Sequence, residues 1–122
     1  MKLTLPLPAK ELSPNKRVHW AIRARAVKAA RDHASMLVRM AGGKHLPRFT
    51  RYTLAFYLPD ARRRDDDNLC ASCKSYRDGI ADGLGVDDHT LKRTGEVGIH
   101  IDRANPRLEI TLINDEMTRR QK

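Results

Sequence analysis

The chain has 122 residues, the length of a single domain, and 40% of them are hydrophobic, which is enough for a small core. Its 24 Lys and Arg exceed its 15 Asp and Glu, and the net charge of +9 favours an anionic partner. No long apolar run could span a membrane, and the opening residues are too short and proline-interrupted for a signal peptide. Two cysteines three residues apart do not form a secreted disulfide framework. We therefore expect the protein to reside in a reducing cytoplasm and to have no membrane partner.

The charge is divided unevenly along the chain. Residues 1–64 hold 15 Lys and Arg against 3 Asp and Glu, a net charge of +12. Residues 65–122 hold 9 against 12, a net charge of −3. The first half is thus suited to phosphate and the second half to cations.

The first half of the chain predicts a strand, a helix and a second strand. Residues 2–7 alternate apolar and polar side chains, as a half-buried strand does. Residues 18–41 predict a long helix that Gly42 and Gly43 end. Its predicted apolar stripe consists of Trp20, Ala24, Val27, Ala30, Ala34, Leu37 and Ala41. Residues 51–58 alternate again, which predicts a strand closed by Pro59.

The second half predicts a helix followed by two strands. The helix begins near Asp67 or Asn68, either of which could cap it, and a tight acidic loop at residues 83–88 ends it. Residues 97–101 and 108–112 alternate and are expected to pair as a hairpin. The element order β-α-β-α-β-β predicts an α+β fold, a single small domain over residues 1–113 with helices packed against a mixed sheet. Residues 114–122 form a polar C-terminal tail.

The run from Arg62 to Asn68 places three arginines directly before three aspartates. Carboxylates this close repel one another, and a divalent cation such as Mg²⁺, which prefers hard oxygen ligands, would hold them together. The planar guanidinium of arginine binds phosphate in bidentate fashion. The run therefore indicates phosphodiester chemistry. The alternative is a solvated loop in which arginines and aspartates pair with each other, and on this run alone that alternative is favoured because charge runs are common.

Other acidic and basic residues could join this run. Asp65 and Asp67 lie two apart and point to the same side if the backbone is extended. Asp67, Lys74 and Asp78 are separated by 7 and 4 residues and would share one face of the second helix. Lys74 could stabilise a charged transition state, or form a salt bridge with Asp78. If the acidic loop folds back, Asp88 could converge with Asp65 and Asp67 on one or two metal ions.

Two competing motifs are weaker. Cys70 and Cys73 form a CxxC, as redox sites do, but neighbouring carboxylates would raise the thiol pKa and Cys73 falls on the apolar side of the helix. His89 beside Asp88 could contact a metal or substrate, but an ordinary exposed loop histidine is the favoured interpretation.

The chain resembles the RusA family of Holliday-junction resolvases over roughly residues 3 to 112. The resemblance rests on Pro59-Asp60 with the three arginines, the segment Asp65-x-Asp67-Asn68-Leu69, Lys74 with Asp78, Val86-Asp87-Asp88, and the loop Asn15-Lys16-Arg17. It implies an Mg²⁺-dependent endodeoxyribonuclease, with Mn²⁺ as a substitute, that cuts four-way DNA junctions as a homodimer in bacterial cells and is often encoded by phages or prophages.

The resemblance also implies roles for individual residues. Asp65, Asp67 and Asp88 match the catalytic, metal-binding aspartates, and Lys74 matches the catalytic lysine. Lys74 lies about one helical turn later after Asn68 than in the founding member, which is a departure from the pattern. We expect the DNA contacts at Asn15, Lys16, Arg17, Arg62, Arg63 and Arg64. The alternative function is a junction-binding or branched-DNA-binding protein of the same fold that does not cleave.

Overall fold

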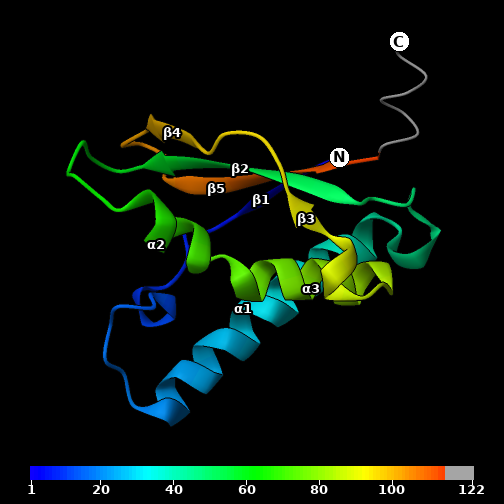
Figure 1. Ribbon diagram of the computed structural model, residues 1–122, viewed down its shortest axis with the longest axis horizontal. Coiled ribbons are helices and arrows are strands. Elements are labelled where there is room, and N and C mark those ends of the chain that lie inside the picture. Colours follow the sequence, from blue (N-terminus) through cyan, green and yellow to red (C-terminus); the bar gives the residue numbers. More distant parts are fainter. Residues whose placement is uncertain (115–122) are drawn as a thin grey trace.

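A computed structural model describes residues 1–114 and has an α+β fold (Figure 1). Three helices lie on one face of a five-stranded mixed sheet. In chain order the elements are β1 (Lys2–Leu5), α1 (Trp20–Ala41), β2 (Arg51–Leu58), α2 (Asp66–Ala71), α3 (Lys74–Leu84), β3 (Lys92–Arg93), β4 (Gly98–Ile101) and β5 (Arg107–Ile113). Short 3-10 helices occur at Lys10–Leu12 (η1), Gly43–His45 (η2) and Asp88–Thr90 (η3). The predicted fold class is confirmed.

The two final strands do not form the predicted hairpin. β5 pairs antiparallel with β1 and with β2, whereas β4 and the two-residue strand β3 pair parallel with the opposite edge of β2. Phe56 of β2 therefore lies between Leu108 of β5 and Ile99 of β4. Alternation of apolar residues identifies a strand but not its neighbour, which is why the hairpin prediction is wrong.

The second predicted helix is two helices, α2 and α3. Asp65 caps α2, in place of the predicted Asp67 or Asn68, and the helix begins at Asp66. The Ser72 hydroxyl donates to the carbonyl oxygen of Asn68 at 2.8 Å, and the Cys73 N–H donates to the carbonyl of Cys70 only three residues earlier. The Ser72 N–H keeps its regular bond to the Asn68 carbonyl, but the Cys73 N–H bond replaces i to i−4 pairing with Leu69, whose carbonyl oxygen accepts from the Cys73 thiol instead. The regular helix is interrupted at this point.

Glycines allow α1 and α3 to approach closely. A Cβ at Gly79 would collide with the carbonyl oxygen of Arg31, and a Cβ at Gly83 would lie 2.7 Å from the Cβ of Val38. Contacts that short do not occur, so any larger residue would push the two helices apart. The buried face of α1 consists of Ala30, Ala34, Ser35 and Val38.

This buried face is narrower than the predicted apolar stripe. Ala30 and Ala34 are buried as expected, but Trp20 is 76% exposed and Val27 is 37% exposed. The first turns of α1 extend away from the sheet, beyond the reach of α3 (Figure 1). Periodicity predicts which residues share a helix face, but it cannot predict how far along the helix a partner extends.

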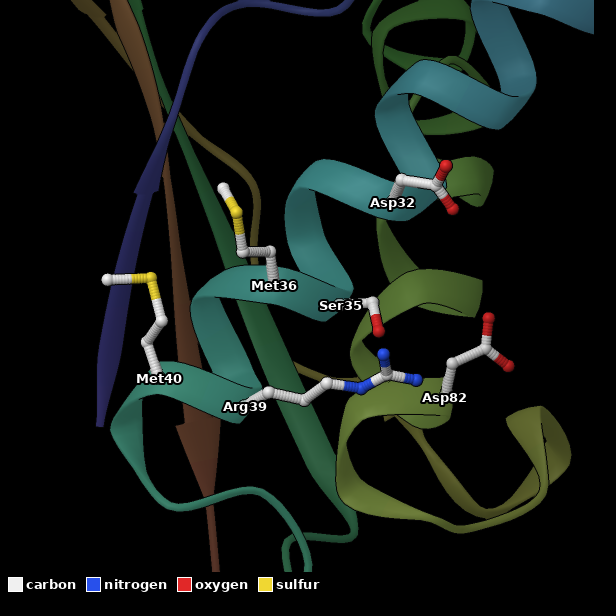
Figure 2. Close-up of a pocket in the computed structure, with 6 residues that line it drawn as sticks. All are labelled: Asp32, Ser35, Met36, Arg39, Met40 and Asp82. Atoms are coloured by element: carbon white, nitrogen blue, oxygen red, sulfur yellow. The ribbon is translucent and has the colours of Figure 1, made fainter.

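A cavity of about 600 Å³ lies on the outer side of this helix pair (Figure 2). It is lined by Asp32, Ser35, Met36, Arg39, Met40 and Asp82. In Figure 2 the Arg39 guanidinium lies between the Ser35 hydroxyl and Asp82. The cavity shares no lining residue with the predicted site, so we assign it to the packing of α1 against α3.

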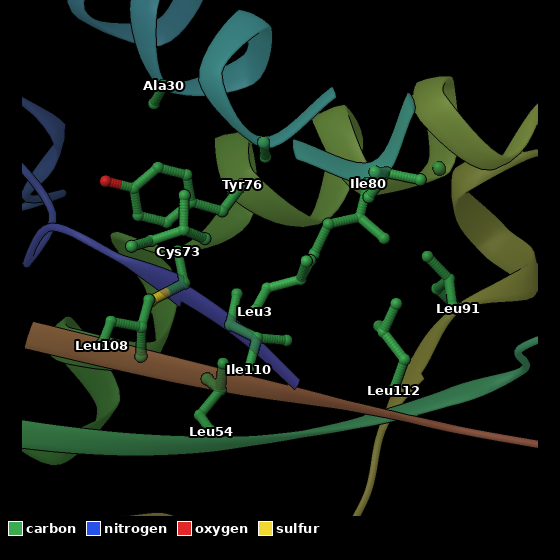
Figure 3. Close-up of a cluster of buried hydrophobic side chains, with 14 of the residues drawn as sticks. Leu3, Ala30, Leu54, Cys73, Tyr76, Ile80, Leu91, Leu108, Ile110 and Leu112 are labelled. Atoms are coloured by element: carbon green, nitrogen blue, oxygen red, sulfur yellow. The ribbon is translucent and has the colours of Figure 1, made fainter. Parts of the chain in front are cut away.

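The core fills the space between the sheet and the helices (Figure 3). β2 and β5 each bury alternate side chains, namely Leu54, Phe56, Leu58, Leu108, Ile110 and Leu112. Tyr76 and Ile80 of α3 pack against them from the helix side. The Tyr76 hydroxyl donates to the carbonyl oxygen of Pro6 at 2.9 Å, so burial leaves this polar group satisfied.

The last described residues include the end of β5 and the first residue of the predicted tail. β5 continues to Ile113, and Asn114, which was assigned to the polar tail, is buried. The rest of that predicted tail, residues 115–122, lies outside the described residues. Within residues 1–114, no helix has the length and apolar character needed to cross a membrane.

Candidate metal and nucleic-acid site

Asp65 is held by the start of α2. Its Oδ1 accepts hydrogen bonds from the N–H groups of Asp67 at 2.9 Å and Asn68 at 3.4 Å, as an N-cap does. β2 ends at Leu58, so Asp65 and Asp67 do not continue an extended strand, and the prediction that alternation places them on the same side is wrong. The helix start positions them instead, because its exposed N–H groups favour carboxylates.

Asp66 and Asp67 are exposed in the first turn of α2. Among residues 1–114, no Lys, Arg or His lies within ion-pair distance of either carboxylate. Burial raises the pKa of the nearby Cys70 thiol; Arg93 opposes this shift, and the charges of Asp66 and Asp67 add to it. The two carboxylates thus impose a negative field on their surroundings that no bonded cation neutralises.

The arginines before Asp65 line a groove of about 540 Å³. Residues of the loop after β1 form the other wall, and the lining comprises Leu7, Pro8, Ala9, Lys10, Ser13, Leu58, Pro59, Arg62, Arg63, Arg64, Asp65, Asn68, Leu69 and Ser72. We call this the arginine groove. It brings the run at Arg62–Asp65 beside Lys10 and Ser13, which belong to residues 10–17, here called the basic segment. The run alone does not predict this neighbour.

The three arginines differ in their partners. Arg64 pairs with Asp60 at 2.9 Å and donates to the carbonyl oxygens of Asp60 and Arg62, so it holds the loop together. Arg62 and Arg63 are exposed, and in the described part of the chain their side chains have no hydrogen-bond or ion-pair partner. Residues 1–114 therefore do not contain the alternative loop, in which the arginines of the run would pair with its own aspartates.

A second acidic group follows α3. Gly85 adopts a left-handed conformation with φ of 73°, which ends the helix and turns the chain into η3. Asp87 caps η3 by accepting from the His89 N–H at 3.0 Å, and this bond lowers the pKa of Asp87. Asp87, Asp88 and His89 each place a ligand atom within 4.8 Å of the others.

The predicted metal ligands fall into two groups in this structure. Asp65 and Asp67 belong to α2, while Asp88 belongs to the group in η3. Within residues 1–114, the trio Asp65, Asp67 and Asp88 does not form a group whose ligand atoms all lie within 4.8 Å of one another. Convergence of all three on one metal stays a prediction.

Arg77 and Arg93 are two further cations in this region that the sequence analysis missed. Arg77 lies 3.2 Å from Asp78 and 3.7 Å from Asp88, and its buried Nε has no hydrogen-bond partner among the described residues. Burial raises the pKa of Tyr52, and the charges of Arg77 and Arg93 both oppose this shift. In the sequence Arg77 directly precedes Asp78, whereas no acidic residue is adjacent to Arg93, so only Arg77 carried a signal.

Lys74 is the first residue of α3 and is exposed. The break before it means that it shares no continuous helix with Asp67, so the predicted common face with Asp67 is wrong. Asp78 pairs with Arg77, and within the described chain Lys74 makes no salt bridge with Asp78. The salt-bridge alternative for Lys74 is therefore absent, while its catalytic role stays a prediction.

The cysteines are poorly suited to redox chemistry. Cys73 is buried, and burial raises its pKa to about 12. The pKa of half-buried Cys70 is also raised, first by burial. Both thiols are free. A reactive cysteine needs a lowered pKa, so this environment opposes the CxxC alternative.

Comparison with known proteins gives one informative similarity. No family model matches the chain. The chain is similar to an uncharacterized protein of Xylella fastidiosa (strain Temecula1 / ATCC 700964), with 54% identity over 90 residues. The match covers 70% of this chain and 59% of the relative's length, so the chain spans less than two thirds of that protein.

Proposed function

We propose that the chain is an Mg²⁺-dependent endodeoxyribonuclease that resolves four-way DNA junctions, as the RusA family does. One observation carries the proposal. Arg62 and Arg63, without carboxylate partners in residues 1–114, open onto the arginine groove at the point where Asp65 borders it. Exposed Asp66 and Asp67 follow directly. Phosphate-binding cations next to unneutralised carboxylates are the combination that phosphodiester hydrolysis needs.

The carboxylate oxygens in this region are the type of ligand that a hard divalent cation binds. Asp65 uses only Oδ1 for capping, so Oδ2 remains available, and Asp67 and Asp88 add further carboxylate oxygens. Mg²⁺ commonly takes one or two carboxylates from a protein, and Mn²⁺ accepts the same ligands. When bound, such an ion would supply electrostatic stabilisation to the oxygens of the scissile phosphodiester.

The basic residues of the chain would bind and orient the DNA. Arg62 and Arg63 would contact backbone phosphates in the arginine groove, with Asn15, Lys16 and Arg17 contacting an adjoining stretch. Arg23 donates to the carbonyl oxygens of Ser13 and Lys16, at 3.3 and 2.7 Å, and thereby secures the loop that carries them. Lys74 would place a further positive charge near the negative charge that develops on phosphate.

A homodimer completes this proposal, because a junction must be cut on two opposed strands. A two-fold dimer presents two identical sites related by the symmetry of the junction. The edge strand β4 is a suitable interface. Ile99 and Ile101 are 41% and 52% exposed there, and within residues 1–114 the outer edge of β4 pairs with no strand. An exposed apolar edge strand is a template for pairing with a second chain.

The function is tested by incubating a synthetic four-way junction with the protein, with and without Mg²⁺. We expect paired, symmetric incisions that require the metal. Tight junction binding without cleavage in Mg²⁺ or Mn²⁺ would favour the non-cleaving alternative. Failure to bind or cut the junction would contradict the proposal as a whole.

The dimer is tested separately by light scattering and by mixed dimers of wild type and Asp67→Asn. A mixed dimer should nick one strand only. Cleavage of both strands by a species with one active subunit, or full activity at monomeric mass, would contradict the dimer.

A further inference from the structure

Trp20 is the only tryptophan in the chain and is 76% exposed at the first turn of α1. Scattered exposed apolar residues are ordinary, so exposure alone indicates nothing. Trp20 differs because its aromatic neighbour is fixed. The His19 Nδ1 accepts a hydrogen bond from the Ala21 N–H at 3.2 Å, which sets the orientation of the imidazole at the start of the helix.

The two rings form a stacked pair. The centroids of His19 and Trp20 lie 5.7 Å apart with an interplanar angle of 30°. Both residues are exposed, so the pair presents an aromatic surface to the outside of the molecule. A flat aromatic surface that is already ordered binds a planar partner without the full cost of immobilising the side chain.

The charged residues of the segment that carries this ring pair are all basic. Residues 12–31 contain six Lys and Arg and no Asp or Glu. Arg31 and Lys28 pair with carboxylates elsewhere, but Lys16, Arg17 and Arg25 are exposed, and in the described part of the chain they contact no carboxylate. A surface of this kind suits a polyanion that also offers planar rings.

The ring pair is connected to the arginine groove. Ser13 lines that groove, and its carbonyl oxygen accepts from Arg23, whose guanidinium also binds the carbonyl of Lys16. The connecting segment runs from below α2 to the first turn of α1 (Figure 1). Basic residues therefore continue from the groove through Lys16 and Arg17 to Trp20.

We infer that Trp20, oriented by His19, stacks on an unpaired or unstacked DNA base while the basic segment holds the adjoining backbone. This inference rests on the proposed function, to which it adds a base-binding position. Stacking accepts any base because every base has a π face, so no sequence preference is expected from this contact. A branch point or single-stranded stretch supplies such a base, and a continuous duplex does not.

The emission of the single tryptophan reports directly on this contact. The protein is titrated in EDTA with a four-way junction, a single strand and a blunt duplex, while the anisotropy of a dye on the DNA reports binding independently. We expect Trp20 emission to fall by at least about half with the junction and the single strand, and to change little with the duplex.

Substitutions provide the second measurement. Trp20→Ala should weaken junction binding by about 5- to 100-fold, and Trp20→Phe, which keeps an aromatic ring, should bind within about threefold of wild type. Met40→Ala is the matched control, because Met40 is 77% exposed near the other end of α1 and lies away from the basic segment. It should bind as wild type does.

The outcomes separate this inference from the proposed function. Normal junction binding with unchanged tryptophan emission, or unchanged affinity in Trp20→Ala, would overturn the inference and leave the nuclease proposal standing. A fall in molecular mass of Trp20→Ala by light scattering would assign the residue to a subunit interface and also overturn it. Absence of junction binding by the wild-type protein would overturn both.

Discussion

Charged residues occur both at the interface between α1 and α3 and beside the arginine groove. The two regions differ in whether these residues pair with a residue of opposite charge. At the helix interface, Arg31 donates to both carboxylate oxygens of Asp82 at 2.5 and 2.9 Å, and this contact lowers the pKa of Asp82. Beside the groove, Arg62 and Asp67 have no partner of opposite charge bonded to their side chains among residues 1–114. Within these residues, charge is neutralised internally at the helix interface, whereas Arg62 and Asp67 are left unneutralised beside the groove where we propose that metal and phosphate bind.

The largest expected effect tests the groove side of this comparison. Asp65→Asn should reduce junction cleavage by more than about 100-fold, because the amide removes the charge that a hard cation needs. Asn is as good an N-cap as Asp, so the melting temperature should stay close to that of wild type. The same prediction for cleavage applies to Asp67→Asn and Asp88→Asn, and junction binding should be retained in each. Cleavage at a near wild-type rate would remove that residue from the site.

The next effect tests the helix interface. Gly79→Ala should lower the free energy of unfolding by about 1–3 kcal/mol, because the added Cβ collides with the carbonyl oxygen of Arg31. Gly98→Ala is the matched control, since its Cβ would lie 3.1 Å from the Nε2 of His100, the end of an exposed side chain that can shift, and 3.4 Å from the Cβ of Ala55, which is an ordinary contact. Denaturant unfolding measures both. An unchanged free energy of unfolding in Gly79→Ala would mean that α1 and α3 do not pack this closely.

The dependence of DNA binding on salt concentration gives a smaller effect. It compares arginines that have no ion-pair partner among residues 1–114 with a lysine that has one. If about six phosphates are neutralised, the logarithm of the binding constant should fall against the logarithm of salt concentration with a slope near −5. Replacing both Arg62 and Arg63 by Ala should make the slope shallower by about 2. Lys28→Ala should leave it unchanged, because Lys28 already pairs with Asp32 at 2.6 Å. Equal changes in both variants would contradict the distinction between neutralised and unneutralised cations.

The smallest expected effect is none at all. Cys70→Ser should cleave as wild type does, and reductant should not alter the rate, since the raised pKa of the thiol keeps it protonated at neutral pH. A cleavage assay in the presence and absence of dithiothreitol measures this. Loss of activity on oxidation that a thiol restores would return the CxxC motif to consideration.

Much of the scaffold was predictable because its signals are local. The alternation in residues 51–58 gave β2 with its bounds, and the glycines after α1 marked its end correctly. The side of β2 on which β4 pairs depends on how the chain passes around the end of that strand, which no local pattern encodes. The break before α3 lies where the Cys73 N–H bonds the carbonyl of Cys70 in place of that of Leu69, an exchange that apolar periodicity does not encode.

The candidate site was likewise predictable only where its signals are local in the sequence. The sequence analysis selected Asp65 and Asp67 from their spacing in the charged run, but the contact that orients Asp65 is a helix cap and not a strand. Arg77 was missed because its relation to Asp88 arises only when η3 folds back along α3. Trp20 was assigned to the core because its periodicity matches buried residues, although no helix reaches far enough to cover it.

The central claim is that carboxylates near the arginine groove serve a ligand, whereas the carboxylate at the helix interface serves the fold. It is tested most directly by measuring both junction cleavage and melting temperature for Asp67→Asn and Asp82→Asn. We expect Asp67→Asn to lose cleavage and melt at or above the wild-type temperature, and Asp82→Asn to cleave normally and melt lower. Loss of cleavage in Asp82→Asn at a temperature where it remains folded, or normal cleavage by Asp67→Asn, would contradict the account.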